Sequence, residues 1–126
     1  MAFKRKSTKE KGTQGEKLAA RFLKKGGFNI LARNYRTPFG EIDIVAEDKG
    51  MLVFVEVRTL SASAGHGPEE TVTLKKQQKI SRIAMAYIQE KGLEDRPARF
   101  DVVAIERSTP RPVIRHHPDA FDIWEP

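Results

Sequence analysis

The first apolar residues of the chain recur every three to four positions, which is the period of one face of an α-helix. Thr13 and Glu16 precede them with the T-x-x-E spacing of a capping box, in which two side chains close the first helical turn. Gly26 and Gly27 follow, and glycine readily adopts the left-handed conformation in which helices end. The pattern therefore predicts a helix that begins near Thr13 and ends before Gly26. Its apolar stripe consists of Leu18, Ala19, Phe22 and Leu23.

Short apolar segments bounded by turn-forming residues predict five strands in the rest of the chain. Residues 41–46 and 51–57 flank a four-residue turn, so we expect them to form a β-hairpin. A second helical pattern begins near Thr71 or Thr73 and stops at Gly92. The remaining predicted strands are residues 28–35, 100–105 and 113–116, and residues 59–68, which are rich in serine, alanine and glycine, are predicted to form a surface loop.

This order of helices and strands predicts an α/β fold, in which helices flank a mixed central β-sheet. The segment 51–57 is apolar on both faces, so it belongs at the centre of the sheet with a covering layer on each side. We expect a single domain over residues 13–126. Residues 1–12 lack apolar periodicity, and they are predicted to form a basic, flexible N-terminal tail.

Composition and charge narrow the class of protein. The chain has 126 residues, of which 39% are hydrophobic and 32% are charged, as in a globular domain. It has no cysteine, which excludes disulfides, thiol catalysis and cysteine-built zinc sites. No apolar run approaches the length of a membrane span and no signal-peptide core is present, so we expect a cytoplasmic protein. The net charge of +6, most of it in residues 1–12, indicates a polyanionic partner such as nucleic acid.

Two carboxylates lie in segments where a charge is unfavourable. Glu56 interrupts the apolar run of the predicted central strand, and Asp43 stands between Ile42 and Ile44 in the preceding strand. An isolated charge in such surroundings is strongly destabilising. We therefore expect these carboxylates to be paired, protonated or bound to a metal.

The register of the hairpin decides how closely the two carboxylates approach. A turn at residues 48–49 places Asp43 opposite Phe54, with Glu56 as its diagonal neighbour. A turn at residues 49–50 instead places Asp43 directly opposite Glu56. In both registers the two carboxylates share one face of the hairpin, because directly opposed residues point to the same side of a sheet.

That face also carries Glu41 and Arg58. Two carboxylates held about 5–8 Å apart repel each other unless a cation lies between them. Mg²⁺ suits such a position because it prefers oxygen ligands. The alternative is that Asp43 faces solvent while Glu56 pairs with Arg58 or Lys76.

These residues also resemble a known signature. The sequences at 40–43 and 55–58, about a dozen residues apart, resemble the D…E-x-K motif of the PD-(D/E)XK nuclease superfamily. More closely, the chain resembles the YraN family of small bacterial proteins over about residues 12–121. The motifs that carry this resemblance are Gly15-Glu16, Asn34-Tyr35-Arg36, GEIDIVA at 40–46, FVEVRT at 54–59, Lys76-Gln77 and RFDVV at 99–103. The resemblance implies a restriction-endonuclease-like fold.

The resemblance also implies a metal site. Asp43 and Glu56 would be ligands of Mg²⁺ or Mn²⁺, and the backbone carbonyl of Val57 could add a third ligand. Glu16 resembles a helical glutamate that completes the acidic cluster in Holliday-junction-resolvase-like members of the superfamily. The capping box with Thr13 explains Glu16 equally well.

Three further residues would complete the catalytic machinery. Lys76 and Gln77 extend the apolar stripe of the second predicted helix toward one end of the sheet, where the superfamily can place polar groups beside the site. The alternative is an ordinary solvated helix start. Arg58 stands where the signature has lysine. Arginine supplies charge and two parallel hydrogen bonds, but it is bulkier than lysine and does not act as a base.

The leading hypothesis is a metal-dependent nuclease that hydrolyses phosphodiester bonds in DNA or RNA. The first alternative is a nucleic-acid-binding module that retains the fold but has lost turnover through Arg58. The second is a protein-interaction adaptor with a structural acidic cluster. Junction resolvases act as dimers, so the resemblance also raises the expectation of a homodimer. Contacts to the nucleic-acid backbone are predicted for Arg33, Arg36, Lys75, Lys79 and Arg82.

Overall fold

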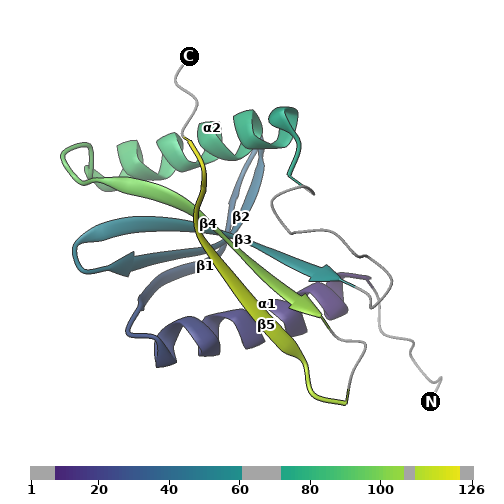
Figure 1. Ribbon diagram of the computed structural model, residues 1–126. Coiled ribbons are helices and arrows are strands. Elements are labelled where there is room, and N and C mark those ends of the chain that lie inside the picture. Colours follow the sequence, from purple (N-terminus) through teal and green to yellow (C-terminus); the bar gives the residue numbers. More distant parts are fainter. Residues whose placement is uncertain (1–7, 61–71, 107–109, 123–126) are drawn as a thin grey trace, which may run out of the picture.

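The computed structural model describes residues 8–60, 72–106 and 110–122, which form two helices and one five-stranded sheet (Figure 1). Residues 1–7 of the predicted tail and most of the predicted surface loop lie outside the described residues. Neither helix that the structure describes combines the length and the apolar character needed to cross a membrane. The elements are α1 (Thr8–Lys25), β1 (Asn29–Thr37), β2 (Gly40–Asp48), β3 (Met51–Leu60), α2 (Leu74–Lys91), β4 (Ala98–Glu106) and β5 (Val113–Phe121).

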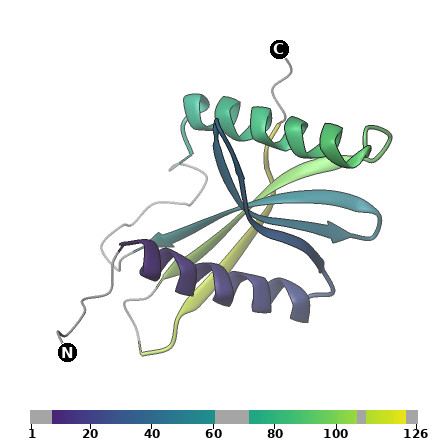
Figure 2. The same cartoon turned by 180° about the vertical axis from the view of Figure 1, so that it is seen from behind.

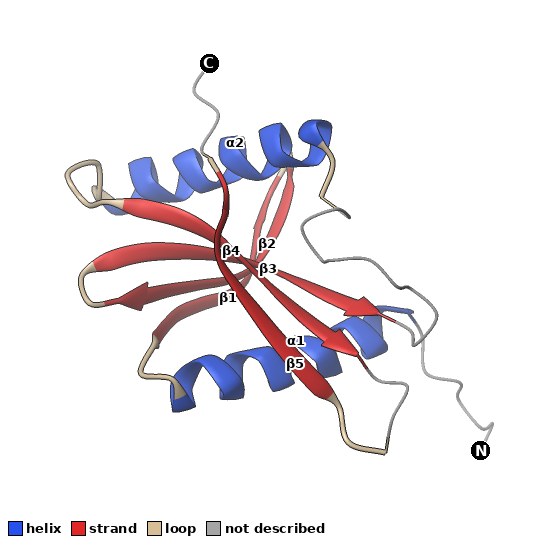
Figure 3. Cartoon of the chain, viewed as in Figure 1, coloured by secondary structure: helices blue, strands red, loops and turns tan. Residues whose placement is uncertain are grey.

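The strands lie side by side in the order of the sequence, from β1 at one edge to β5 at the other. Neighbouring strands are antiparallel except β3 and β4, which are parallel. Parallel neighbours require a long crossover, and α2 lies within this one. Figure 3 shows the two helices on opposite sides of the strands. The predicted mixed sheet with flanking helices is confirmed, and it is consistent with a restriction-endonuclease-like arrangement.

Each helix covers its own apolar cluster. Val53 and Val55 of β3 pack in the cluster under α1, whereas Leu52 and Phe54 pack in the cluster under α2. The alternation arises because successive side chains of a strand point to opposite faces of the sheet. All four are almost fully buried, which confirms the predicted central strand with a layer on each side.

The first helix is longer than its sequence pattern predicts. It begins at Thr8, five residues before the expected start at Thr13. Residues 8–12 lack an apolar stripe, but most of them are lysine, glutamate or threonine, and none is a proline. The helix continues through them, so Thr13 is not its N-cap and Glu16 is not a capping-box residue. The predicted domain boundary at residue 13 therefore falls inside α1.

Both predicted ends of the second helix are confirmed. Thr73 is the N-cap, and its side chain accepts a hydrogen bond from the backbone N–H of Lys76 at 3.1 Å. Gly92 ends the helix in the left-handed conformation, with φ of 66°. The cap fixes the first turn of α2, and it thereby places the lysines of that turn relative to the sheet.

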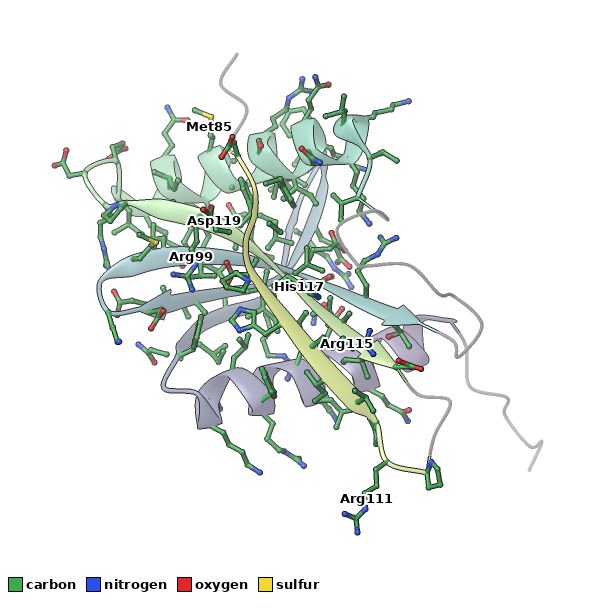
Figure 4. All side chains as sticks on the ribbon, in the orientation of Figure 1. Met85, Arg99, Arg111, Arg115, His117 and Asp119 are labelled. Atoms are coloured by element: carbon green, nitrogen blue, oxygen red, sulfur yellow. The ribbon has the colours of Figure 1, made fainter. Side chains whose placement is uncertain are left out.

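The last strand continues past its predicted end at His116, because a buried carboxylate holds its irregular second half. Asp101 on β4 is fully buried, and it accepts the backbone N–H of Asp119 at 2.9 Å. It also accepts hydrogen bonds from Arg99 Nε at 2.9 Å and from His116 Nε2 at 2.7 Å (Figure 4, where Arg99 and Asp119 are labelled). Burial alone would raise the pKa of Asp101, but these hydrogen bonds outweigh it and hold the pKa below its usual value.

We expect Asp101→Asn to lower the free energy of unfolding by about 3 kcal/mol, because the change removes one partner of a buried, charged hydrogen-bond network. The pKa of Asp101 is lowered in the folded state, so its stabilisation is complete at neutral pH and is lost as the pH falls through that pKa. Urea denaturation at pH 7 and pH 3 measures both effects. Asp95→Asn, at an exposed position, is the matched control. Equal midpoints for the two variants would contradict this role.

Candidate active site

The β2–β3 hairpin adopts the second of the two predicted registers. Its pairs run from Asp48 opposite Met51 to Ile44 opposite Val55. The turn at residues 49–50 has positive φ at both positions, 51° and 85°, as a type I′ turn requires. Continued by one residue, this register places Asp43 opposite Glu56.

The two strands separate at this point. The β1–β2 hairpin rises toward α2, whereas β3 continues toward the N-terminal part of α1 (Figure 1). Asp43 lies at the divergence, and its Oδ2 accepts the backbone N–H of Val57 at 2.8 Å. A side-chain carboxylate thus takes the place of a strand carbonyl, and it is fixed between the two central strands of the site.

A third element adds Glu16 of α1, which is 8% exposed. The helix approaches β3 closely at the preceding residue, Gly15, where a Cβ atom would lie 2.9 Å from Thr59 Oγ1. Glycine is unfavourable inside a helix, and this close approach accounts for its presence here. Glu16 Oε2 is buried and has no hydrogen-bond partner among the described residues.

The surroundings of Glu16 are polar and acidic. Burial raises the pKa of Glu16. A side-chain hydrogen bond with Asn34 opposes this rise, whereas the negative charge of Glu41 increases it. Asn34 has φ of 53° within β1, a left-handed conformation that asparagine tolerates better than most residues. Glu16, Glu41 and Asp43 each bring a carboxylate oxygen within 4.8 Å of the others. We call Glu16, Glu41, Asp43 and Glu56 the acidic cluster.

Asp43 is the most strongly perturbed member of the acidic cluster. Burial raises its pKa from 3.8 to about 8, and the charge of Glu56 adds to this effect. The hydrogen bond from Val57 opposes the shift, and Glu16 reinforces it. At neutral pH the cluster therefore retains a proton that a bound cation would displace.

Lysines of α2 face the acidic cluster across a hollow of about 540 Å³. Lys76 Nζ lies 3.4 Å from Glu56 Oε1, and Lys75 and Lys79 line the same hollow. An adjoining hollow of about 300 Å³ is lined by Glu16, Asp43, Glu56, Val57, Arg58, Thr59 and Lys76. The site therefore combines carboxylates from α1, β2 and β3 with cations from β3 and α2.

Most of the predicted catalytic residues meet here, and the two hollows together bring in Glu16, Asp43, Glu56, Val57, Arg58 and Lys76. Gln77 lines neither hollow, and its side-chain amide donates to the carbonyl of Val72 at 3.1 Å. The alternative interpretation predicted that Glu56 pairs with Arg58 or Lys76 and that Asp43 faces solvent. The Glu56–Lys76 pair is present. Asp43, however, is partly buried and accepts a hydrogen bond from the backbone N–H of Val57.

The predicted nucleic-acid contacts are spread around the site. Lys75 and Lys79 border the larger hollow, as described above. Arg82 lies over the exposed ring of Phe39, with 5.5 Å between the guanidinium carbon and the ring centroid. Arg36 pairs with Glu41 at 3.0 Å, and the positive charge of Arg33 acts on Glu16. That these five residues contact nucleic acid stays a prediction.

Sequence reasoning missed two members of the site. Glu41 lies on the face predicted for it, although the prediction gives it no role as a ligand; its alternation with Asp43 along β2 is the signal that indicates such a role. Asn34 belongs to the Asn34-Tyr35-Arg36 motif, but nothing in that motif indicates a hydrogen bond to a helix. The approach of Glu41 to Glu16 and the hydrogen bond between Asn34 and Glu16 both depend on how α1 crosses the sheet, which a sequence pattern does not specify.

Comparison with known proteins places the chain in a family. The model of the family described as "Uncharacterised protein family UPF0102" matches residues 15–105. The chain belongs to this family. A UPF0102 protein of Syntrophotalea carbinolica is 45% identical over 112 residues, which are 89% of this chain and 91% of that protein. One from Geotalea uraniireducens is 44% identical over 120 residues, which are 94% of each chain. UPF0102 is YraN-like, so the predicted family is confirmed.

We expect Asp43→Asn to stabilise this UPF0102 protein at pH 8 by at least about 2 kcal/mol, and by much less at pH 5. The pKa of Asp43 is raised to about 8 in the folded state, so folding opposes its ionisation. Stability of the unsubstituted chain therefore falls as the pH rises from about 4 to 8. Thermal denaturation over pH 5–9 without divalent ions measures this dependence.

The matched control for this measurement is Glu41→Gln, which removes a charge from the exposed member of the acidic cluster. We expect it to change the pH dependence only slightly. If Asp43→Asn and the unsubstituted chain lose stability in parallel between pH 5 and pH 8, the raised pKa of Asp43 is wrong.

Proposed function

We propose that this UPF0102 protein is a metal-dependent nuclease of the PD-(D/E)XK superfamily that hydrolyses phosphodiester bonds in nucleic acid. The observation that carries the proposal is Glu16 Oε2, which is buried without a hydrogen-bond partner among the described residues and belongs to a cluster of three close carboxylates. Burial of such an oxygen is unfavourable unless the carboxyl is protonated or a cation reaches it, and the neighbouring carboxylates make this a place where a cation would bind. The cytoplasmic location and the homodimer stay predictions.

The donor set fits a hard divalent cation. All candidate ligands are oxygens, which Mg²⁺ and Mn²⁺ prefer. Asp43 and Glu56 would hold the ion, and Glu16 and Glu41 each bring a carboxylate oxygen within 4.8 Å of one of Asp43. The carbonyl of Val57 is a further candidate, because the N–H of this residue already faces Asp43. When bound, such an ion polarises the phosphate and lowers the pKa of the attacking water.

The proposed reaction is a hydrolysis. The oxygen of a water molecule forms a bond to phosphorus, the ester P–O bond breaks, and the leaving oxygen takes a proton. The products are a phosphomonoester and a free hydroxyl. Negative charge builds up on the phosphoryl oxygens in the transition state, and fixed cations stabilise it. Lys75 and Lys79 line the larger hollow, and they would hold the phosphates next to the reacting one.

Lys76 supplies the compact cation that the signature motif expects at position 58. Its ammonium group is 3.4 Å from Glu56, and it lines both hollows of the site. Arg58 lines only the smaller one. We infer that a lysine from α2 takes the place of the missing lysine of β3. Arg58 would then add charge without positioning the water.

We expect the purified protein to cleave branched, flapped or single-stranded DNA or RNA when Mg²⁺ or Mn²⁺ is present. Asp43→Asn should lower the rate at least about 100-fold, because it removes a central ligand and an essential charge. Cleavage of end-labelled oligonucleotides, resolved by denaturing electrophoresis, measures the rate. Binding of Mn²⁺, followed by electron paramagnetic resonance, should weaken in the same variant.

The matched control for the cleavage assay is Asp95→Asn, an exposed aspartate in the turn after α2. It should cleave like the unsubstituted protein. Equal rates for Asp43→Asn and the unsubstituted protein would show that the activity comes from a contaminant, and the proposal would fail.

A second candidate function, a binding module without turnover, is favoured by Arg58 in place of lysine. Two variants separate the candidates. If Lys76 is the functional cation, Lys76→Met lowers cleavage at least about 100-fold, whereas Arg58→Lys changes it little. If the unsubstituted protein is inactive and Arg58→Lys gains metal-dependent cleavage, the binding module is correct. The assay is the same oligonucleotide cleavage.

A further inference from the structure

A third hollow, of about 490 Å³, lies between α1 and β1, outside the acidic cluster. Figure 2 shows α1 on the side of the sheet opposite α2. The hollow is lined by Lys17, Ala20, Arg21, Lys24, Ile30 and Arg33. Four of these residues are cations and none is acidic. We call this feature the basic hollow.

The helical period brings three of the cations together. Lys17, Arg21 and Lys24 are spaced by four and three residues, so they project from the same side of α1. None of them forms an ion pair with a described side chain. Other exposed arginines of the sheet are paired, as Arg36 is with Glu41. Like charges around a concavity repel one another, and an anion in the hollow would relieve that repulsion.

The basic hollow adjoins the acidic cluster. Arg33 lines the hollow, and its positive charge also acts on Glu16, where it partly opposes the rise in pKa that burial causes. Glu16 and Lys17 are consecutive residues of α1, with Glu16 buried toward the sheet and Lys17 exposed. A single extended ligand could therefore lie along α1 and reach the carboxylates without a break.

We propose that the basic hollow binds the phosphate backbone of a nucleic-acid strand whose neighbouring phosphodiester lies at the acidic cluster. This inference rests on the proposed function, since it places the flank of the same substrate. From Lys17 to Lys24 the helix rises about 10 Å, at about 1.5 Å per residue. With about 3.4 Å of axis per phosphate in one strand, that length matches about three phosphates. The contacts carry no sequence preference, because they reach only the backbone.

A membrane surface fits this helix less well than nucleic acid does. Helices that lie on bilayers insert an apolar face between the lipids while basic residues contact the headgroups. The apolar face of α1 is already occupied, since Ala19 and Leu23 are at most 1% exposed under the sheet. The basic hollow therefore offers charge and concavity, while the apolar face of the helix that carries it is not free to insert into lipid.

Simultaneous substitution of Lys17, Arg21 and Lys24 by glutamine tests the inference. Glutamine keeps a similar helix propensity and removes the three charges. Binding of fluorescent single-stranded and duplex oligonucleotides is measured by anisotropy in EDTA at 50–200 mM salt. The slope of log K against log salt should become shallower by about 2–3, since each lost phosphate contact removes about 0.7–0.9. At 50 mM salt the affinity should fall at least about tenfold.

The matched control removes the same number of charges away from the hollow, by Lys25→Gln, Lys49→Asn and Lys91→Gln. Asparagine suits position 49, where φ is 51°. The control should keep the slope of the unsubstituted protein within about 1. Equal slopes and affinities for the two triple variants would overturn the inference. Binding to vesicles of anionic lipid, with no binding to either oligonucleotide, would overturn it as well.

The same variants separate this inference from the proposed function. The variant with glutamine at positions 17, 21 and 24, called the hollow variant, should retain Mn²⁺ binding, because its substitutions leave the acidic cluster unchanged. If the unsubstituted protein neither binds Mn²⁺ nor cleaves, but its oligonucleotide affinity still depends on the three cations, only the nuclease proposal fails. If cleavage and Mn²⁺ binding are found while the hollow variant binds oligonucleotides as the control does, only the basic hollow fails.

Discussion

The hydrogen bond from Val57 N–H to Asp43 stands at the point where β2 and β3 separate, and the candidate site depends on it. Up to Ile44 and Val55 the strands pair in a regular ladder. Beyond that pair the N–H of Val57 needs another acceptor, because an unpaired backbone donor is destabilising. Asp43 provides it at 2.8 Å. The carboxylate is thus held in a partly buried position next to Glu56, where its pKa rises to about 8.

The two helices contribute to this point from opposite faces of the sheet, and their contributions have opposite charge. α1 brings Glu16 against Asp43, which its close approach at Gly15 permits. α2 brings Lys76 against Glu56, and the Thr73 cap fixes the turn that carries it. Each helix is anchored by its own apolar cluster. Both charged groups therefore stand on rigid elements, as a site that must hold fixed geometry requires.

Local patterns predicted the strands that form the sheet, the shared face of Asp43 and Glu56, and both ends of α2, because each depends on neighbouring residues or on one hairpin. The start of α1 was wrong, since polar residues with adequate helix propensity leave no apolar stripe to read. Glu16 had a sufficient local explanation as a capping residue, and only the packing of α1 gives it contacts with Asn34 and Asp43. Contacts between distant elements leave no periodic signal in a single sequence.

The arrangement of charge also links metal binding to nucleic-acid binding. A phosphate that approaches the acidic cluster meets carboxylates, and their repulsion is strongest where the reaction would occur. The cations stand beside the cluster, on α2 across the larger hollow and on α1 at the basic hollow. These cations can hold the nucleic-acid backbone on either side of the carboxylates, but they do not remove the repulsion between the carboxylates and the reacting phosphate. A divalent ion would do so, and it would also release the proton that the raised pKa of Asp43 retains. Affinity without metal therefore reports the flanking cations, and the gain on adding metal reports the acidic cluster.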